Sequence, residues 1–195
     1  EMCIRDRRLE LTWPGKEDRF NPEPRILLED MKKSYSRSAE QTDLLDSAVR
    51  PTFDNMLIHG DNLLALKALE QDYSGKIKCI YIDPPYNTGN AFEHYDDGLE
   101  HSIWLSLMRD RLEILKRLLA EDGSIFIQIN DDEYPYLKII CDEVFGRNNY
   151  EATFYVKVRH ENRILREDTR YQLVIEQVLF YKKSNLFIPV SYTHL

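Results

Sequence analysis

The chain has 195 residues, of which 43% are hydrophobic and 11% aromatic, and its formal net charge at pH 7 is −8. This composition excludes a disordered chain, and the length suits one α/β domain with a substantial core. No apolar run reaches the length of a membrane span, and the first residues lack the apolar segment of a secretory signal. The three cysteines, at positions 3, 79 and 141, form no Cys-x-x-Cys pair. That disfavours a zinc site or a disulfide framework and favours a reducing cytoplasm.

The negative charge is unusual for a chain that binds nucleic acid, because phosphate contacts are normally made by Lys and Arg. Either the partner is not a polyanion, or the basic part is local or missing. One basic stretch is present, formed by Lys157, Arg159, His160, Arg163, Arg166 and Arg170.

The segment 1–54 is polar and is interrupted by four prolines, at positions 14, 22, 24 and 51. Proline fixes its own φ and has no N–H to donate, so it interrupts regular structure. We predict an extended arm over this segment, with one short strand at 9–13.

From residue 55 onward, short apolar runs alternate with amphipathic stretches. The pattern predicts a strand at 55–59, a helix that Asp61 or Asn62 caps and Gly75 ends, and a buried strand at 77–82. The apolar residues of the helix are Leu63, Leu64, Leu66 and Leu69.

The most periodic segment, 102–120, predicts a long helix that the following Asp-Gly pair ends. A buried strand at 124–129 comes next, and the acidic residues 131–133 should cap a helix that stops at Gly146. The long helix is expected to place six apolar residues on one face: Ile103, Leu107, Met108, Leu112, Leu115 and Leu119.

Two further strands are expected at 152–158 and 178–182, on either side of a charged stretch. Strands that alternate with helices of this length imply βαβ crossovers. The sequence therefore predicts an α/β fold with a mostly parallel sheet and flanking helices.

The most informative residues are Asp83, Pro84, Pro85 and Tyr86, which follow the strand at 77–82 directly. Since two prolines end regular structure, a carboxylate, stiff carbonyls and an aromatic ring are presented together at the carboxyl end of a strand. Ligands of open α/β sheets bind at that edge.

The sequence lacks the motifs that other classes of reaction need. The sequence has no Gly-x-x-x-x-Gly-Lys loop for phosphoryl transfer and no Gly-x-Ser-x-Gly elbow for acyl transfer. His94 and His101 are seven residues apart, which favours solvated side chains over metal ligands, so no metal is expected.

The motif suits the exocyclic amine of a nucleobase, whose lone pair is delocalised into the ring. A fixed carboxylate and a backbone carbonyl can hold the two N–H hydrogens out of the ring plane, which frees the lone pair for attack. Tyr86 would stack on the base, and a duplex base reaches such a pocket only when it is flipped out of the stack.

Asp83-Pro-Pro-Tyr resembles the catalytic motif of amino-group DNA methyltransferases that use S-adenosylmethionine. The chain resembles the β-class adenine-N6 enzymes more closely, and among these the modification subunits of type III restriction systems. The resemblance extends over about residues 9–183 and is most specific within 55–150. Five stretches carry it: 57–67, 75–90, 104–112, 123–132 and 136–146.

The resemblance implies a Rossmann-like methyltransferase sheet with S-adenosylmethionine as cofactor. Asp83 and the Pro84 carbonyl would bind the target N6 amine, Pro85 would stiffen the loop, and Tyr86 would stack on the base. Asp rather than Ser at position 83 is similar to the adenine enzymes more than to most cytosine-N4 enzymes.

Other roles follow from the same resemblance. Asp61 matches a position near the cofactor's adenine, and a simple helix cap is an equally good explanation for it. Asn87 and Thr88 would position the loop or the methionine moiety. Contacts to DNA are expected from the basic stretch, at Lys157, Arg159 and Arg163.

Four more charged residues have ordinary structural explanations. Asp131 and Asp132 follow a strand at the same edge of the sheet, where helix-capping carboxylates are more common than catalytic ones. Arg109 and Arg111 lie on a helix, where a solvated or packing face is favoured over a DNA contact.

The sequence departs from the family in its glycines, which lie at 15, 60, 75, 89, 98, 123 and 146. No two lie within three residues of each other, so no Gly-x-Gly cradle for the cofactor can be drawn. We expect a fragment: an arm at 1–54, a catalytic half at 55–158 and the start of a target-recognition region at 159–188. The segments 1–7 and 189–195 do not resemble the family and are expected to be non-native.

The predicted function is site-specific methylation of adenine N6 in double-stranded DNA, in the cytoplasm. In full-length relatives the subunit pairs with itself and with a helicase-like restriction subunit that carries the nuclease. Two alternatives stay open. One is methylation of cytosine N4, RNA or a glutamine side chain, against which Asp83 counts, and the other is a catalytically idle binding or assembly module.

Overall fold

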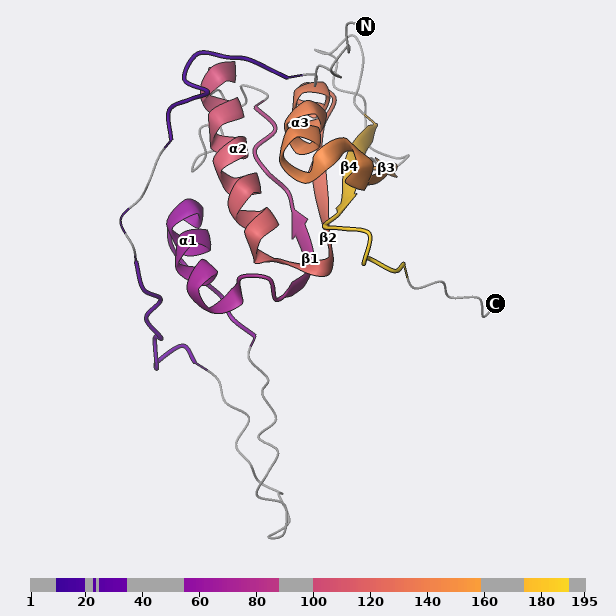
Figure 1. Ribbon diagram of the computed structural model, residues 1–195. Helices are drawn as coiled ribbons and strands as arrows, with labels where there is room; N and C mark the ends of the chain where they lie inside the picture. Colours follow the sequence, from indigo (N-terminus) through magenta and orange to yellow (C-terminus); the bar gives the residue numbers. More distant parts are fainter. Residues whose placement is uncertain are drawn as a thin grey trace, which may run out of the picture.

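The computed structural model describes residues 10–19, 23, 25–34, 55–87, 100–158 and 174–189. Within this part, α2 lies between α1 and α3, and four strands form one sheet in the order β1-β2-β4-β3 (Figure 1). No described helix combines the length and the apolar character that a bilayer crossing needs. The elements in chain order are α1 Asn62–Tyr73, β1 Ile77–Ile82, α2 His101–Leu118, β2 Leu119–Ile129, α3 Tyr134–Cys141, the π-helix η1 Asp142–Gly146, the 3-10 helix η2 Arg147–Asn149, β3 Tyr150–Lys157 and β4 Ile175–Lys182.

The α/β class is confirmed, but the parallel character is limited to one pair of described strands. β1 pairs with β2 in parallel, whereas β4 is antiparallel to both β2 and β3. β3 and β4 are consecutive in the chain, and the ladder between them continues to a bond from the Val158 N–H to the Val174 carbonyl. The two strands are therefore antiparallel neighbours, whereas the predicted mostly parallel sheet would need a crossover connection between neighbouring strands.

The core lies between α2 and one face of the sheet. Alternate strand residues point to this face, and those that are buried in it are Ile80, Ile125, Ile127, Ile129, Leu179 and Tyr181. On the helix side, Trp104, Met108, Leu112 and Leu115 form a stripe at helical spacing. Ile103 was predicted on this face but is 52% exposed, because the buried stripe is centred one residue later, on Trp104.

The opposite face of the sheet is only partly covered. Phe126 and Phe180 stack there with ring centroids 4.5 Å apart, while Tyr81 is 58% exposed. β1 is an edge strand of the described sheet, and Ile80 is its one buried residue. The prediction that the whole strand is buried is therefore wrong for the described structure.

Three predicted boundaries need correction. The described residues of 9–13 and all of 55–59 form no strand, and Leu57 is fully exposed because no described strand pairs with its segment. The Asp-Gly pair does not end the long helix, since β2 begins at Leu119. A register shift between β1 and β2 accommodates the pair, and a Cβ on Gly123 would lie 2.7 Å from the Ile77 carbonyl oxygen.

Residues 10–19 pack against α2, although the sequence suggests an extended arm. Trp13 is buried, and its indole N–H donates to the Ser106 hydroxyl at 2.8 Å. Arg109 is 3% exposed and donates to the carbonyls of Lys16 and Asp18, the latter at 2.8 Å. The expected packing role of Arg109 is confirmed.

Candidate active site

The Asp-Pro-Pro-Tyr segment leaves β1 at the carboxyl edge of the parallel pair. The Asp83 side chain is exposed, so its carboxylate is not turned into the core. Pro84, Pro85 and Tyr86 are half-buried. The segment is thus anchored to the domain on one side and open to solvent at its first residue.

The carbonyl of Pro85 is held by the core of the domain. The indole N–H of the fully buried Trp104 donates to it at 2.8 Å. The Trp104 side chain is packed between its own helix, α2, and the sheet. Its bond therefore fixes the position of the Pro85 carbonyl relative to the sheet edge. Among the described residues, no hydrogen bond engages the carbonyl of Pro84.

The hydroxyl of Tyr86 is held by β4. It donates to Glu176 Oε2 at 2.9 Å, and Glu176 also accepts from Gln128 Nε2 at 2.5 Å. Burial, the bond to Glu176 and the nearby Asp83 carboxylate raise the pKa of Tyr86 far above its ordinary value. The hydroxyl therefore stays protonated at neutral pH, and its bond fixes the direction of the ring.

The side chain of Asn87 is held by the loop after β2. Its Nδ2 donates to Glu133 Oε1 at 2.8 Å, and the same oxygen lies 3.0 Å from His101 Nδ1. Asn87 has φ 56°, in the left-handed region that few residues other than glycine adopt. Glu133 is 4% exposed.

Three consecutive residues are thus fixed by three different elements, and the two residues before them offer acceptors. Pro85, Tyr86 and Asn87 are bound by α2, β4 and the start of α3. Asp83 offers a carboxylate and Pro84 a carbonyl. Acceptors on two consecutive residues match a group with two N–H donors, such as an amine on a planar ring.

Asp61 is the N-cap of α1. Its Oδ1 accepts from the backbone N–H groups of Leu63 and Leu64, both at 3.0 Å. The helix-cap interpretation is confirmed. A role of Asp61 toward a cofactor rests on the resemblance alone.

The acidic residues after β2 do not cap α3 with their side chains as predicted. Glu133 occupies the N-cap position without a side-chain cap bond, because its carboxylate reaches Asn87 instead. Asp132 accepts from Asn130 at 2.7 Å, and Asp131 accepts from Gln177. The first bond lies within the loop after β2, and the second ties this loop to β4.

Of the remaining residues named in the sequence analysis, the structure describes some and leaves others outside its described part. Lys157 is exposed at the end of β3. Arg111 donates to Asn62 Oδ1 at 2.7 Å, which links α2 to α1. Three predicted site residues lie outside the described part of the chain: Thr88, Arg159 and Arg163.

Trp104, Glu133 and Glu176 were not predicted as site residues. Trp104 lies in a stretch that resembles the family, so that stretch was its only signal in the sequence. Glu133 follows two other acids, and the sequence predicts a helix-capping role for all three. No pattern in the sequence around Glu176 singles it out.

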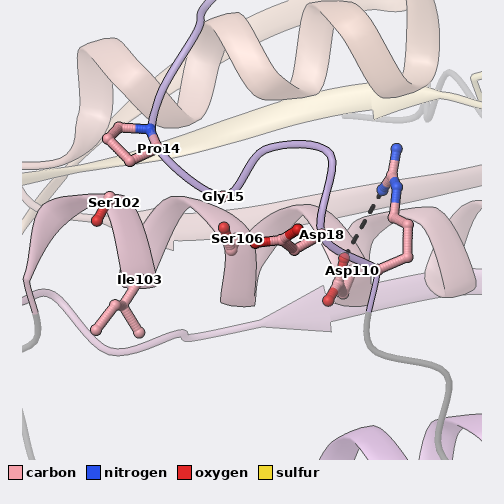
Figure 2. A pocket seen from close by; sticks show the side chains of 8 residues that line it. Pro14, Gly15, Asp18, Ser102, Ile103, Ser106 and Asp110 are labelled. Atoms are coloured by element: carbon pink, nitrogen blue, oxygen red, sulfur yellow. Dashed lines mark ion pairs between the residues drawn. The ribbon is translucent and has the colours of Figure 1, made fainter.

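A separate hollow of about 420 Å³ lies between the turn at residues 14–19 and the first turns of α2 (Figure 2). Arg19 and Asp110 form an ion pair of 3.7 Å at its rim. No residue of the Asp83–Asn87 loop lines it. The site described above is therefore the loop itself and not this hollow.

The fold and the loop define an α/β domain in which a loop with two prolines and an exposed carboxylate leaves the carboxyl edge of the parallel strands. The family model N6_N4_Mtase, described as DNA methylase, matches residues 77–194, which is more than half of the chain. The chain belongs to this family.

The names of similar proteins fit this family. The "Probable type III restriction-modification enzyme HindVI Mod subunit" of Haemophilus influenzae is 46% identical over 125 residues, which are 60% of this chain and 17% of that protein. The type III restriction-modification enzyme EcoP15I Mod subunit of Escherichia coli is 34% identical over 168 residues, or 68% of this chain and 26% of that protein. The chain thus spans about a quarter or less of the length of these two relatives.

Among solved structures, the M1.HpyAVI–SAM complex aligns with a TM-score of 0.45 and 18% identity, over 71% of this chain and 60% of that chain.

Proposed function

We propose that this chain is the catalytic half of a site-specific DNA methyltransferase that transfers a methyl group to adenine N6. The observation that carries the proposal is the loop in which residues 85, 86 and 87 are held by other elements while Asp83 and Pro84 present acceptors. Membership of the DNA methylase family and the Mod subunits among its relatives support DNA as the substrate.

In this proposal, Asp83 and the Pro84 carbonyl each accept one hydrogen of the N6 amine of an adenine flipped out of the duplex. Holding both hydrogens in fixed directions moves the nitrogen toward tetrahedral geometry and makes its lone pair available. The ring of Tyr86, oriented by Glu176, stacks on the base. When the amine accepts the methyl group, the bond from that group to the donor's sulfur would break and leave its electron pair on the sulfur. The Asp83 carboxylate or solvent would take up the N6 proton that the amine loses.

S-adenosylmethionine would supply the electrophilic methyl group. The described residues fit the amine side of this reaction better than the cofactor side. Asp61 caps α1 with one carboxylate oxygen, the amide of Asn87 binds Glu133, and the sequence has no Gly-x-Gly cradle. We therefore propose that the cofactor is held mainly by parts of a longer protein, with Asp61, Asn87 and Thr88 at the border of its site.

The proposal extends to partners. Lys157, Arg159 and Arg163 would contact DNA phosphates at the start of a target-recognition region within 159–188. The longer protein would form a homodimer in the cytoplasm. It would also associate with a helicase-nuclease restriction subunit, which the names of the Mod subunits among its relatives support.

The test is mass spectrometry of DNA from cells that express this chain within its complete reading frame. N6-methyladenine is the expected product. N4-methylcytosine, or no modified base, would contradict the proposal. Unchanged methylation after Asp83→Ala would show that the loop is an idle binding module.

The isolated chain provides a second measurement. Calorimetric titration with S-adenosylmethionine should show no binding in the micromolar range, because the described residues supply only the amine side. Micromolar binding would mean that the chain carries a complete cofactor site.

A further inference from the structure

We propose that Glu133 is a positioning residue for methyl transfer: it holds Asn87 in its left-handed conformation and so sets the direction of the Asp83–Asn87 loop. This inference rests on the proposed function, since it assigns Glu133 a part in presenting the amine acceptors. Nothing in the family match or in the resemblance assigns a role to this residue.

The burial of Glu133 needs an explanation. A carboxylate that is only 4% exposed is costly unless polar partners surround it. At the N-cap of a helix its natural partners are the free N–H groups of the first turn, yet it makes no such bond to α3. Its Oε1 faces Asn87 and His101 instead.

One oxygen of this carboxylate is left over. Glu133 Oε2 is buried and has no hydrogen-bond partner among the described residues. Because the Glu133 side chain binds Asn87 and makes no cap bond to α3, its burial is accounted for by the contact with Asn87.

The contact with Glu133 stabilises an uncommon backbone conformation of Asn87. A left-handed φ of 56° is uncommon outside glycine, although Asn tolerates it better than most residues. Such a conformation persists when the surroundings over-determine it. The bond of 2.8 Å to Glu133 is one such constraint, and Asn87 follows Tyr86 directly. Its backbone conformation therefore helps to fix the end of the Asp83–Asn87 loop next to Tyr86.

The first turn of α2 braces the loop twice. Trp104 binds the Pro85 carbonyl directly, and His101, three residues earlier, lies beside Glu133. The His101 ring also packs edge-on against Tyr136 of α3, with centroids 4.4 Å apart. Glu133 thus stands at the point where α2, α3 and the loop after β1 meet, so its loss changes the position of the loop and leaves the exposed Asp83 chemically intact.

This arrangement predicts an effect on turnover rather than on DNA affinity. Glu133 is buried and offers no surface to DNA, so the KM for DNA should change less than twofold. A displacement of the amine acceptors by about 1 Å is enough to lower a rate about a hundredfold. We expect kcat to fall about tenfold to a hundredfold when the contact is removed.

The experiment uses the complete protein that contains this chain, with Glu133→Ala, Glu133→Gln, Asn87→Gly and the pair Asn87→Gly with Glu133→Ala. Glutamine keeps an acceptor oxygen for Asn87, so Glu133→Gln should recover most of the kcat that alanine loses. Glycine adopts the left-handed conformation without help. Adding Asn87→Gly to Glu133→Ala should therefore cause no further loss of kcat.

Glu143→Gln is the matched control. Glu143 lies in η1, where it accepts from the Leu11 N–H at 2.7 Å and from Lys16 at 2.9 Å, away from the loop. This variant should keep kcat while losing comparable polar contacts. Melting temperatures of all variants are measured in parallel, so that activity is compared only below the onset of unfolding.

The outcomes separate this inference from the proposed function. If the unsubstituted protein makes no N6-methyladenine, the proposed function fails and the inference falls with it. If the unsubstituted protein methylates adenine while Glu133→Ala keeps its kcat, the inference alone is overturned. Losses that multiply in the double variant, or a Glu133→Gln variant that is as slow as alanine, overturn it as well.

Discussion

Two acidic loops leave the parallel strands β1 and β2 at the same edge of the sheet. The loop after β1 exposes the carboxylate of Asp83, whereas the loop after β2 buries that of Glu133, which binds Asn87 of the first loop. Both acids follow a strand closely, so sequence position alone assigns them the same place. Burial and partners separate the exposed acid, which we propose accepts from the target amine, from the buried acid, which binds Asn87.

The strongest test of this comparison is Asp83→Asn in the complete protein that contains this chain, which is also the background for the variants that follow. An amide replaces one acceptor oxygen with an NH2 donor that opposes the substrate amine, so methylation should fall about a hundredfold to a thousandfold. Because Asp83 is exposed, the melting temperature should hardly change. Methylation is measured by transfer of labelled methyl groups to DNA.

Asp132→Asn is the control, since it changes an exposed carboxylate at the same edge, one that binds Asn130. Its methylation rate should stay near that of the unsubstituted protein. Equal losses from the two variants would show that the edge as a whole, and not the loop after β1, carries the site.

The next largest effect is expected from Trp104→Phe. The Pro85 carbonyl then loses its buried donor, which costs about 1–3 kcal/mol for an unsatisfied polar group. The loop should rise from the sheet edge, and methylation should fall together with the free energy of unfolding. Both are measured on the same preparations, by activity and by denaturant titration.

Trp13→Phe provides a matched comparison, because Trp13 also donates one indole hydrogen bond into the surroundings of α2, to Ser106. It should lower the free energy of unfolding to a similar extent and leave methylation unchanged. A loss of methylation with Trp13→Phe would mean that α2 as a whole, rather than its bond to Pro85, supports the loop.

The sequence was sufficient wherever the signal is local. The Asp61 cap and the periodic leucines predict α1, and the alternating apolar residues predict β3 and β4 to within a few residues. The Asp-Pro-Pro-Tyr motif is local as well, so the exposed position of Asp83 after a strand followed from the sequence. Each of these features depends on residues that are close in the chain.

The supports of the loop were not predictable in this way. Glu133 is 46 residues from Asn87, and Glu176 is 90 residues from Tyr86. No spacing rule connects residues so far apart, and only the folded sheet brings them together. The exposed Ile103 has a similar cause, because the tertiary position of Trp104 decided which stripe of α2 is buried.

A smaller effect is expected from Tyr86→Phe, which keeps the ring and removes the bond to Glu176. A hydrogen bond of this kind contributes about 1 kcal/mol, so methylation should fall about threefold to tenfold. The raised pKa of Tyr86 keeps its hydroxyl protonated throughout the neutral range. The ratio of the two activities should therefore stay constant from about pH 6 to pH 9.

Tyr81→Phe is the control for that variant. The Tyr81 hydroxyl binds Gln128 in the same network, but its ring lies on β1 and not in the loop. Methylation by Tyr81→Phe should match the unsubstituted protein. A ratio for Tyr86→Phe that changes across this pH range would mean that the Tyr86 hydroxyl ionises and does more than orient the ring.

Asp61 adds a third acidic residue to the comparison, and the smallest expected effect. Asp61→Ala removes the acceptor of two backbone N–H groups and should lower the free energy of unfolding by about 1 kcal/mol. Asp61→Asn should keep that stability, because Asn caps a helix as well as Asp does. Asp72→Ala, an exposed substitution in the last turn of the same helix, should leave the free energy of unfolding unchanged.

The same variants also test the cofactor role of Asp61. If Asp61→Asn weakens the binding of S-adenosylmethionine by the complete protein, the charge of Asp61 serves the cofactor as well as the helix. If both Asp61 variants bind S-adenosylmethionine like the unsubstituted protein, Asp61 belongs with Glu133 among the acids that shape the domain. Of these three acids, Asp83 is then the one that we propose faces a ligand.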